Sequence, residues 1–278
     1  MRWWLAGLVG CAPQTEDGPE PEVIPLCNGS DALCDRTIDE VVFVATHNSM
    51  SSDERGWLGP NHLYAVPTQL ADGVRALNLD VYEVEGQAML CHGFCSLGEQ
   101  PLVEALDEVG AWLSANPREV ILLTFEMYAP PELVVTAFED ASLVGQAHAL
   151  QPGQLPTLGE LIEADERLLV FTSDGGGSPG WYHAMWDWWW DNPYAAETVE
   201  DFSCALYRGD KDNPLMAINH FLTAPIGLER LAQEANTADV LETHIRACMA
   251  SAGRHPTQIM VDFYSIGDVF EVAAALNR

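Results

Sequence analysis

The chain has 278 residues, a formal net charge of −30 and 48% hydrophobic residues. This length and apolar content suffice for a full hydrophobic core, in one domain of barrel size or in two, and they exclude general disorder. The 42 acidic residues against 12 basic ones exclude nucleic acid as an expected partner, because a phosphate backbone requires a basic surface. They also argue against unaided docking on anionic membranes and favour a salty or extracellular setting.

The first eleven residues are typical of an export signal. One positive charge precedes an apolar stretch, and residues 8–11 (LVGC) are similar to the cleavage box of bacterial lipoproteins, in which Cys11 would carry a lipid. An ordinary secretory signal is the alternative, and a membrane span would need ~20 apolar residues. Residues 12–26, rich in Pro, Glu, Asp and Gly, are predicted to be a tether to a single folded domain over residues 27–278. We therefore expect an extracytoplasmic monomer, either secreted or anchored to a bacterial outer membrane through Cys11.

Seven cysteines are present, so six remain when Cys11 is set aside, and an even number suits an oxidising compartment. Fifteen pairings of six cysteines exist, and sequence alone permits all of them. A zinc site is the alternative, but the spacings contain no paired CxxC motif. Local proximity favours Cys27–Cys34, Cys91–Cys95 and Cys204–Cys248.

Strand-like and helix-like segments alternate after the tether. Apolar, β-rich runs occupy residues 41–45, 77–82, 120–125, 168–172, 215–221 and 259–264, and helical patterns occupy 101–115, 131–143, 240–252 and 268–276, with a further helix start at the capping box 157–160. Near-continuous apolar strands indicate a sheet covered on both faces. The alternation predicts an α/β fold, and a barrel more than an open sheet, because polar residues cluster at the strand C-termini.

Two histidines follow strand-like runs, His47 after residues 41–45 and His92 after residues 89–91. A reaction that takes a proton from one oxygen and gives one to another needs two groups that titrate near neutrality, and histidine does so unaided. A lone histidine is more often structural. We interpret the remaining histidines in that way: His62, His148, His183, His220, His244 and His255.

Polar side chains accompany this pair at the predicted strand ends. Asn78 and Asp80 share one face of their strand, and Glu126 directly follows another apolar strand. With Asn48 they offer hard oxygen donors suited to a divalent cation, which together with two histidines indicates a phosphodiesterase. The alternative is that Asp80 and Glu126 are structural partners of Arg75.

Two further features carry open alternatives. Asp262 ends a predicted strand, where it could orient His47, bind substrate or satisfy the core. The aromatic run 181–190 is predicted mostly to pack, with Trp188 to Trp190 partly lining a substrate entrance. No GxSxG motif supports a catalytic serine, and no P-loop supports nucleotide binding.

An ordered set of motifs resembles a known family. Residues 46–49 (THNS), 73–80 (GVRALNLD), 90–93 (LCHG) and 116–121 (NPREVI) are similar to the X domain of phosphatidylinositol-specific phospholipases C, and residues 167–172 (RLLVFT) and 261–264 (VDFY) to its secreted, X-domain-only branch. The resemblance covers roughly residues 27–278, and the ordered set is more specific than any single motif. It implies an irregular TIM-type barrel of mainly parallel strands with chemistry at the C-terminal rim.

The resemblance also implies roles for the histidines. His47 would be the general base that deprotonates the inositol 2-hydroxyl, which attacks phosphorus. His92 would be the general acid that protonates the leaving diacylglycerol oxygen, and a cyclic phosphate would result.

The family divides on the source of positive charge. Calcium-dependent members hold the metal with an Asn after the first His, two acids in one strand and a Glu on the next, whereas metal-independent bacterial members carry an Arg where Asp80 stands. The chain matches the metal type except at Asn78, where the calcium enzymes carry Glu. We therefore expect Ca²⁺ with the ligands Asn48, Asn78, Asp80 and Glu126. Without calcium, Arg75 becomes the candidate phosphate-binding cation, and Asp262 is a further substrate-binding candidate.

The leading hypothesis is an extracytoplasmic phosphodiesterase of phospholipase C type, acting on a phospholipid or small phosphodiester. Glycerophosphodiester hydrolysis is the second enzymatic reading, although it normally requires Glu where Asn78 stands. A lipid-anchored binding protein that kept the fold but lost turnover is the non-enzymatic alternative.

Overall fold

The computed structural model describes residue 1, residues 26–224 and residues 226–278, so Cys11 and nearly all of the predicted tether lie outside the described residues. Eleven strands form one sheet. The strands are β1 Phe43–Thr46, β2 Ala76–Val84, β3 Gln87–Cys91, β4 Glu99–Pro101, β5 Ile121–Tyr128, β6 Leu168–Thr172, β7 Tyr182–Ala184, β8 Trp189–Asp191, β9 Arg208–Gly209, β10 Leu215–Asn219 and β11 Gln258–Val261. The helices are α1 Val66–Asp72, α2 Leu102–Ala115, α3 Pro131–Asp140, α4 Leu158–Glu163, α5 Glu229–Ala235, α6 Ala238–Ala252 and α7 Val269–Leu276.

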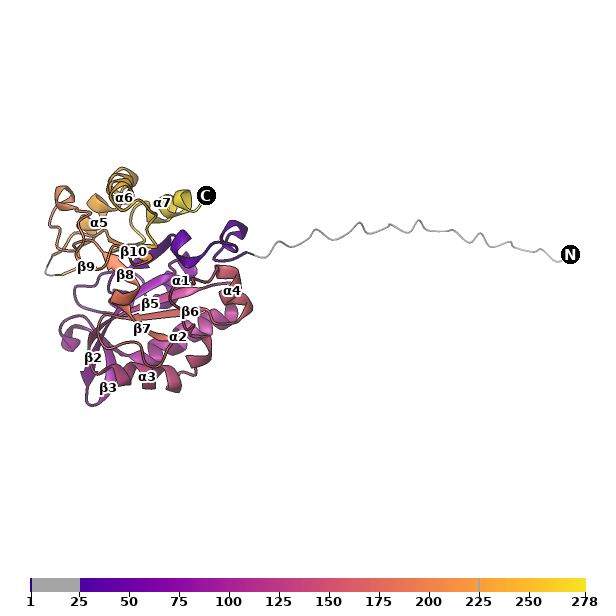
Figure 1. Ribbon diagram of the computed structural model, residues 1–278. Coiled ribbons are helices and arrows are strands. Elements are labelled where there is room, and N and C mark those ends of the chain that lie inside the picture. The colour runs from indigo at the N-terminus through magenta and orange to yellow at the C-terminus, as the bar shows by residue number, and fades with distance from the viewer. Residues whose placement is uncertain (2–25, 225) are drawn as a thin grey trace.

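The sheet follows the order β7-β6-β5-β2-β1-β11-β10-β8-β9. All pairs along it are parallel except β8 with β9, and the hairpin strands β3 and β4 extend from β2 as antiparallel additions. The sheet curls into a barrel flanked by helices, with α2 and α3 beside its first half and α5 to α7 beside its second (Figure 1). The predicted α/β barrel is confirmed, with one irregularity: among the described residues no ladder joins β7 to β8.

Side-chain alternation along the strands separates the two largest clusters of the core. Phe43 and Ala45 of β1 belong to the cluster inside the barrel, whereas Val44 belongs to the cluster between sheet and helices. On β2, Ala76 lies on the interior face, and Leu77 packs outward. The polar residues that follow Ala76 at every second position therefore continue the interior face toward the rim.

The aromatic run 181–190 includes β7 and most of β8, and most of its aromatic rings are buried. Trp189 is fully buried inside the barrel and meets Phe171 edge-on at 5.4 Å between ring centroids. Trp190 is buried on the helix side of the sheet. The predicted packing role is thus right, but the predicted lining of the entrance by Trp188 to Trp190 is wrong, because the cavity is lined by Trp186 instead.

Several predicted limits are close to the observed ones. The capping box of Thr157 and Glu160 opens α4 as predicted. The two predicted strands that end late, 215–221 and 259–264, stop at Asn219 and Val261. The residues beyond those points leave the ladder because they turn toward the rim of the barrel.

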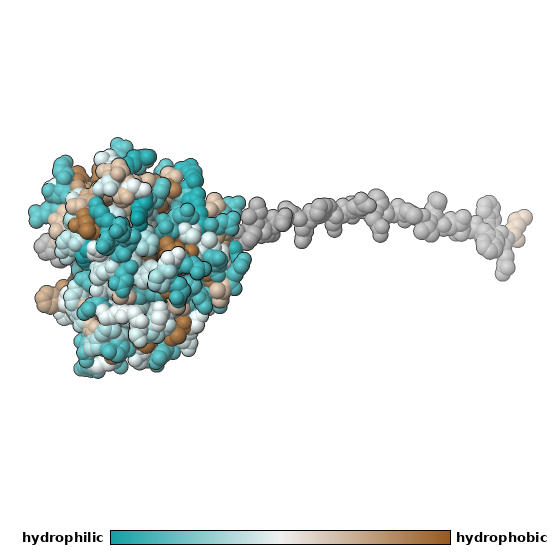
Figure 2. All heavy atoms as spheres, in the orientation of Figure 1, coloured by the Kyte–Doolittle hydropathy of each residue, from teal (hydrophilic) through white to brown (hydrophobic). Residues whose placement is uncertain are grey.

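Three disulfides join Cys27 to Cys34, Cys91 to Cys95 and Cys204 to Cys248, which confirms the predicted pairing. Figure 2 shows a face covered mainly by hydrophilic side chains with small separate apolar areas, as the excess of acidic residues implies. Across the described part of the chain, no helix has the length and apolarity to cross a membrane.

Candidate active site

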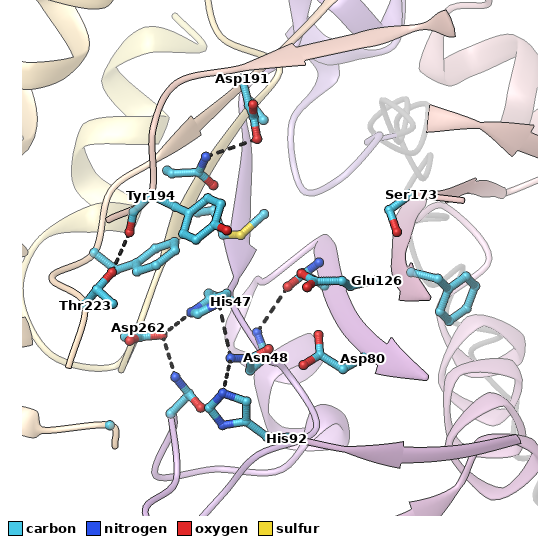
Figure 3. Close-up of a pocket in the computed structure, with 18 of the residues that line it drawn as sticks. His47, Asn48, Asp80, His92, Glu126, Ser173, Asp191, Tyr194, Thr223 and Asp262 are labelled. Atoms are coloured by element: carbon cyan, nitrogen blue, oxygen red, sulfur yellow. Dashed lines mark hydrogen bonds and ion pairs between the residues drawn. The ribbon is translucent and has the colours of Figure 1, made fainter. Parts of the chain in front are cut away.

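A cavity of about 340 Å³ lies at the carboxyl ends of the parallel strands. The predicted residues that line it are His47, Asn48, Asn78, Asp80, His92, Glu126 and Asp262. Figure 3 shows Asn48 between His47 and His92, with the carboxylates of Asp80 and Glu126 beside this group. The structure thus brings together residues that are up to 215 positions apart in the sequence.

His47 directly follows β1 and is held on three sides. Its Nδ1 lies 3.0 Å from Oδ1 of Asp262, and its ring stacks on Phe221 with 4.0 Å between centroids. Its Nε2 lies 3.1 Å from Nδ2 of Asn48. Since a carboxylate can only accept, Nδ1 carries the proton and Nε2 directs its lone pair toward the cavity.

Asn48 links the two histidines. Its backbone lies in the left-handed region with φ of 50°, which asparagine tolerates better than most residues. Its Nδ2 also lies 3.2 Å from Nε2 of His92. One amide group therefore donates to both rings, and the two Nε2 atoms converge on the same part of the cavity.

His92 reaches this position through a hairpin. Strand β2 runs beyond the rim, turns at Glu85 and Gly86, and returns as β3 with Val81 paired to Leu90. His92 follows β3 directly. The disulfide between Cys91 and Cys95 closes the loop that carries it.

The two histidines have pKa values displaced in opposite directions. Burial alone would lower the pKa of His47, but Asp262, with smaller contributions from Asp80 and Glu126, raises it above the ordinary value. Burial and the neighbouring His47 lower the pKa of His92. Neutral His47 is therefore the stronger base of the pair, and protonated His92 is the stronger acid.

A pair of carboxylates lies beside the histidines. The register of β2 on β5 sets Asp80 directly opposite Glu126. Asp80 is 5% exposed, and its Oδ1 is buried without a hydrogen-bond partner among the described residues. Burial and the neighbouring Glu126 raise the pKa of Asp80 to about 8. Glu126 accepts a short hydrogen bond from the hydroxyl of Tyr128, which stacks on Tyr82.

These residues fit a divalent cation. A buried carboxylate oxygen without a donor is costly, and a cation is one group that would satisfy it. Asn48 uses its amide nitrogen for the histidines, which leaves its carbonyl oxygen for another partner. Asn78 is less available, because its Oδ1 accepts from the backbone N–H of Asn48 at 3.4 Å and its Nδ2 donates to Thr124.

Arg75 is not part of this site, and its predicted substrate role is wrong. It precedes β2, at the end of the strand opposite the rim. Its Nε donates to Glu119 at 2.7 Å, and its guanidinium lies 4.5 Å from the ring centroid of Trp112. Its partner is Glu119, so the alternative pairing of Arg75 with Asp80 and Glu126 is also wrong.

The opposite wall of the cavity was not predicted. Asp191 ends β8, and its carboxylate accepts hydrogen bonds from Arg208 of β9 and from Asn219 of β10. The Arg208 guanidinium lies 4.7 Å from the ring of Trp186 and 5.1 Å from that of Tyr194. This wall therefore presents a guanidinium already paired with Asp191, an amide and aromatic faces to the cavity.

One signal could have identified this wall. Asp191 follows two buried tryptophans at the end of a strand, the same pattern of a carboxylate after an apolar run that marked Glu126. Arg208 has no comparable signal, because its place depends on the antiparallel return of β9 onto β8.

Comparisons with known proteins identify relatives of this chain. The family model described as PI-PLC X 1 matches residues 33–277. A PI-PLC X domain-containing protein 1 of the fungus Arthroderma benhamiae is 27% identical over 303 residues, which covers 99% of this chain and 96% of that protein. A PI-PLC X domain-containing protein of Arabidopsis thaliana is 28% identical over 287 residues, which covers 91% and 67%.

A solved structure of a Staphylococcus aureus phosphatidylinositol-specific phospholipase C mutant superposes with a TM-score of 0.62 at 16% identity, covering 87% of this chain and 93% of that one. At this identity it shows the fold alone. A further relative, described as an uncharacterized secreted protein of Arthroderma benhamiae, is 28% identical over 299 residues, 96% of this chain and 67% of its own length. That relative and the three disulfides indicate an extracytoplasmic location, whereas fungal and plant relatives give no support to a bacterial lipoprotein anchor.

Proposed function

The chain belongs to the PI-PLC X domain family, and from that premise we propose that it is a phosphodiesterase of phospholipase C type that cleaves a phosphatidylinositol-like diester. One observation carries the proposal. The two histidine rings converge through Nε2 on a single cavity, and one of them is held by a carboxylate on its far nitrogen. This arrangement suits transfer of two protons around one phosphorus atom.

In the proposed reaction His47 Nε2 takes the proton from a head-group hydroxyl next to the phosphate. The hydroxyl oxygen forms a bond to phosphorus, and the bond between phosphorus and the leaving alcohol oxygen breaks. His92 donates its proton to that oxygen, so that an alcohol and a cyclic phosphate leave the site. Asp262 stabilises the imidazolium formed on His47.

Asn48, Asn78, Asp80 and Glu126 would hold a Ca²⁺ ion. Bound there, the ion would supply positive charge to the equatorial phosphate oxygens. The unpartnered oxygen of Asp80 supports this assignment. The neutral Asn78 lowers the ligand charge, so we expect a weaker site than one with a third carboxylate.

The distribution of polar and apolar side chains supports one orientation of the substrate, with its head group near Arg208 and its leaving alcohol near His92. The wall that carries Arg208, Asp191 and Tyr194 suits a hydroxylated head group. Phe94, two residues after His92, is 74% exposed, and Ile226, which lines the cavity, is 50% exposed. An apolar leaving alcohol would therefore lie next to the residue assigned as the acid.

³¹P NMR of purified protein with separate phosphodiesters tests the proposal. We expect a cyclic phosphate signal from phosphatidylinositol and little turnover of glycerophosphodiesters. Preferred turnover of a glycerophosphodiester would support the second enzymatic reading. No turnover of either, with or without Ca²⁺, would support the binding-protein reading.

We retain export as part of the proposal. Whether Cys11 carries a lipid can be tested by mass spectrometry of the mature N-terminus from the native host. An acylated Cys11 is expected for an anchored form, and a new N-terminus downstream is expected for a secreted form.

A further inference from the structure

Asn61 lies in the loop between β1 and α1 and contacts Asp262, the partner of His47. It is 3% exposed, and its Nδ2 donates to Oδ1 of Asp262 at 3.1 Å. This is the same oxygen that accepts from Nδ1 of His47 at 3.0 Å. Only the nitrogen of an amide can face a carboxylate oxygen favourably, so the orientation of the Asn61 side chain is set by Asp262.

The amide of Asn61 is poorly satisfied apart from this bond. Its Oδ1 is buried and has no hydrogen-bond partner in the described chain. A buried acceptor without a donor destabilises the folded chain, and an apolar residue of similar size would avoid that cost. Stability therefore does not explain an asparagine here, whereas the donor to Asp262 does.

The backbone around Asn61 fixes the geometry further. Its N–H donates to the Ser51 carbonyl at 3.1 Å, and its own carbonyl accepts from the N–H of Phe263 at 2.8 Å. Phe263 has φ of 44°, a left-handed conformation that is strained for a bulky residue. Asn61 therefore bonds both the carboxylate of Asp262 and the backbone N–H of Phe263, the next residue, which has the uncommon conformation.

His62, the residue after Asn61, contacts the backbone of His47. His62 is fully buried, and its Nε2 lies 2.7 Å from the backbone carbonyl of His47. The carbonyl can only accept, so His62 donates from Nε2. Asn61 and His62 together therefore restrain both the ring and the backbone of His47.

We propose that Asn61 is a positioning residue that acts through Asp262 on His47. Two donors on Oδ1 prevent the carboxylate from rotating away, so the His47 proton stays on Nδ1 and its lone pair stays on Nε2, facing the cavity. The consequence for catalysis rests on the proposed function. The consequence for the tautomer of His47 does not, because it needs no substrate.

The test compares two buried asparagines that both contact Asp262. Asn61 donates to its carboxylate, whereas Asn236 donates to its backbone carbonyl at 2.9 Å and to that of Ile266 at 3.2 Å. Asn61→Leu removes the donor and the unpartnered oxygen together. Asn61→Asp keeps the shape and replaces the donor with an acceptor, so it serves as the second variant if Asn61→Leu does not fold. Asn236→Ser is the matched control.

We expect Asn61→Leu and Asn61→Asp to lower kcat by about 10- to 100-fold with little change in KM, because misplaced catalytic groups lose rate more than binding. Two-dimensional ¹H–¹⁵N NMR of His47 should show a mixture of tautomers in both variants and a single Nδ1–H tautomer in the wild type and in Asn236→Ser. An unchanged His47 spectrum in folded Asn61 variants would overturn the proposal, and so would equal effects in Asn236→Ser. If the wild type cleaves no phosphodiester, the proposed function fails, while the NMR comparison still decides the role of Asn61.

Discussion

Two buried aspartates line the same cavity, Asp191 at the end of β8 and Asp80 in the middle of β2, and they are in opposite states. Asp191 on β8 is 1% exposed and accepts hydrogen bonds from the side chains of Arg208 and Asn219 and from the backbone of Arg208. Asp80 on β2 is 5% exposed, has an oxygen without a partner, and lies opposite a second carboxylate. Both follow buried strand residues, yet only one is neutralised by the chain itself.

The side of the cavity that carries Asp191 has its charge paired within the chain, whereas the side that carries Asp80 and Glu126 has a buried oxygen without a partner among the described residues. The chain supplies the cation for Asp191, so that wall is preorganised to meet a neutral or polar group. Among the described residues it supplies none for Asp80 and Glu126, so we expect a cation from solution to stabilise that wall. Both histidines contact Asn48, which is a candidate ligand on the side of Asp80 and Glu126, where charge would change in the proposed phosphoryl transfer.

The largest loss of activity should come from replacing the two histidines. His47→Ala and His92→Ala should each lower kcat/KM by roughly 10²–10⁴-fold without unfolding, because each removes one proton transfer. A substrate with a very good leaving group should partly rescue His92→Ala only, since the acid alone serves the leaving oxygen. Steady-state kinetics with two leaving groups measures both, and wild-type rates in either variant would refute the assignment.

Replacing each of the two aspartates by asparagine should change the free energy of unfolding in opposite directions. Asp191→Asn should lower the free energy of unfolding by about 1–3 kcal/mol, because it weakens hydrogen bonds to a charged partner. The Asp80 carboxyl has a pKa of about 8 in the folded chain against 3.8 for an ordinary aspartate, so it costs stability as pH rises through that window. Asp80→Asn should therefore stabilise the metal-free protein by about 1–3 kcal/mol at pH 7. Urea unfolding in chelator measures both, and equal signs would contradict the comparison.

Acid should lower the free energy of unfolding, because three buried histidines are neutral in the folded chain. Burial lowers the pKa of His62 and His244 to about 4 and of His220 to about 3, against 6.5 in the unfolded chain. The unfolded chain then binds more protons, so stability falls as pH drops from 6.5 toward 4, by about 1.4 kcal/mol per pH unit for each histidine. Unfolding free energies at pH 7 and 5 should show a shallower loss in His244→Gln, whereas the exposed His255→Gln should keep the wild-type slope.

Calcium should complete the wall around Asp80. We expect chelation to suppress turnover, and Asn78→Glu to tighten Ca²⁺ by roughly tenfold because it restores a charged ligand. Calorimetric titration of the wild type, Asn78→Glu and Asp80→Asn measures the affinities, which should fall in the order Asn78→Glu, wild type, Asp80→Asn. Full activity in excess chelator, with no metal in the purified protein, would remove the calcium model.

The smallest effect should come from the loop of His92. Replacing Cys91 and Cys95 together by serine should lower kcat a few-fold at nearly unchanged Tm, because the bridge spans only four positions and acts on the loop rather than on the barrel. Replacing Cys204 and Cys248, which are 44 positions apart, should act mainly on Tm. A loss of Tm without loss of kcat in the first pair would contradict this distinction.

The sequence by itself determined the features that depend on short-range patterns. Alternation along β2 placed Asn78 and Asp80 on the interior face, and strand-terminal positions identified His47 and His92. The position of Arg75 before its strand also contained the information that it lies away from the rim, because side chains before and after a parallel strand lie at opposite ends of the sheet. That prediction failed although its signal was local.

Only the tertiary structure decided which distant groups meet. Asn61 and Asp262 are 201 positions apart, and Arg208 reaches Asp191 through a two-residue antiparallel strand that no periodicity marks. Periodicity specifies the face on which a side chain lies but not the neighbour that it meets. Whether a buried aspartate is neutralised by the chain or left for a cation is therefore settled by non-local pairing, because only folding sets the distance between the charges.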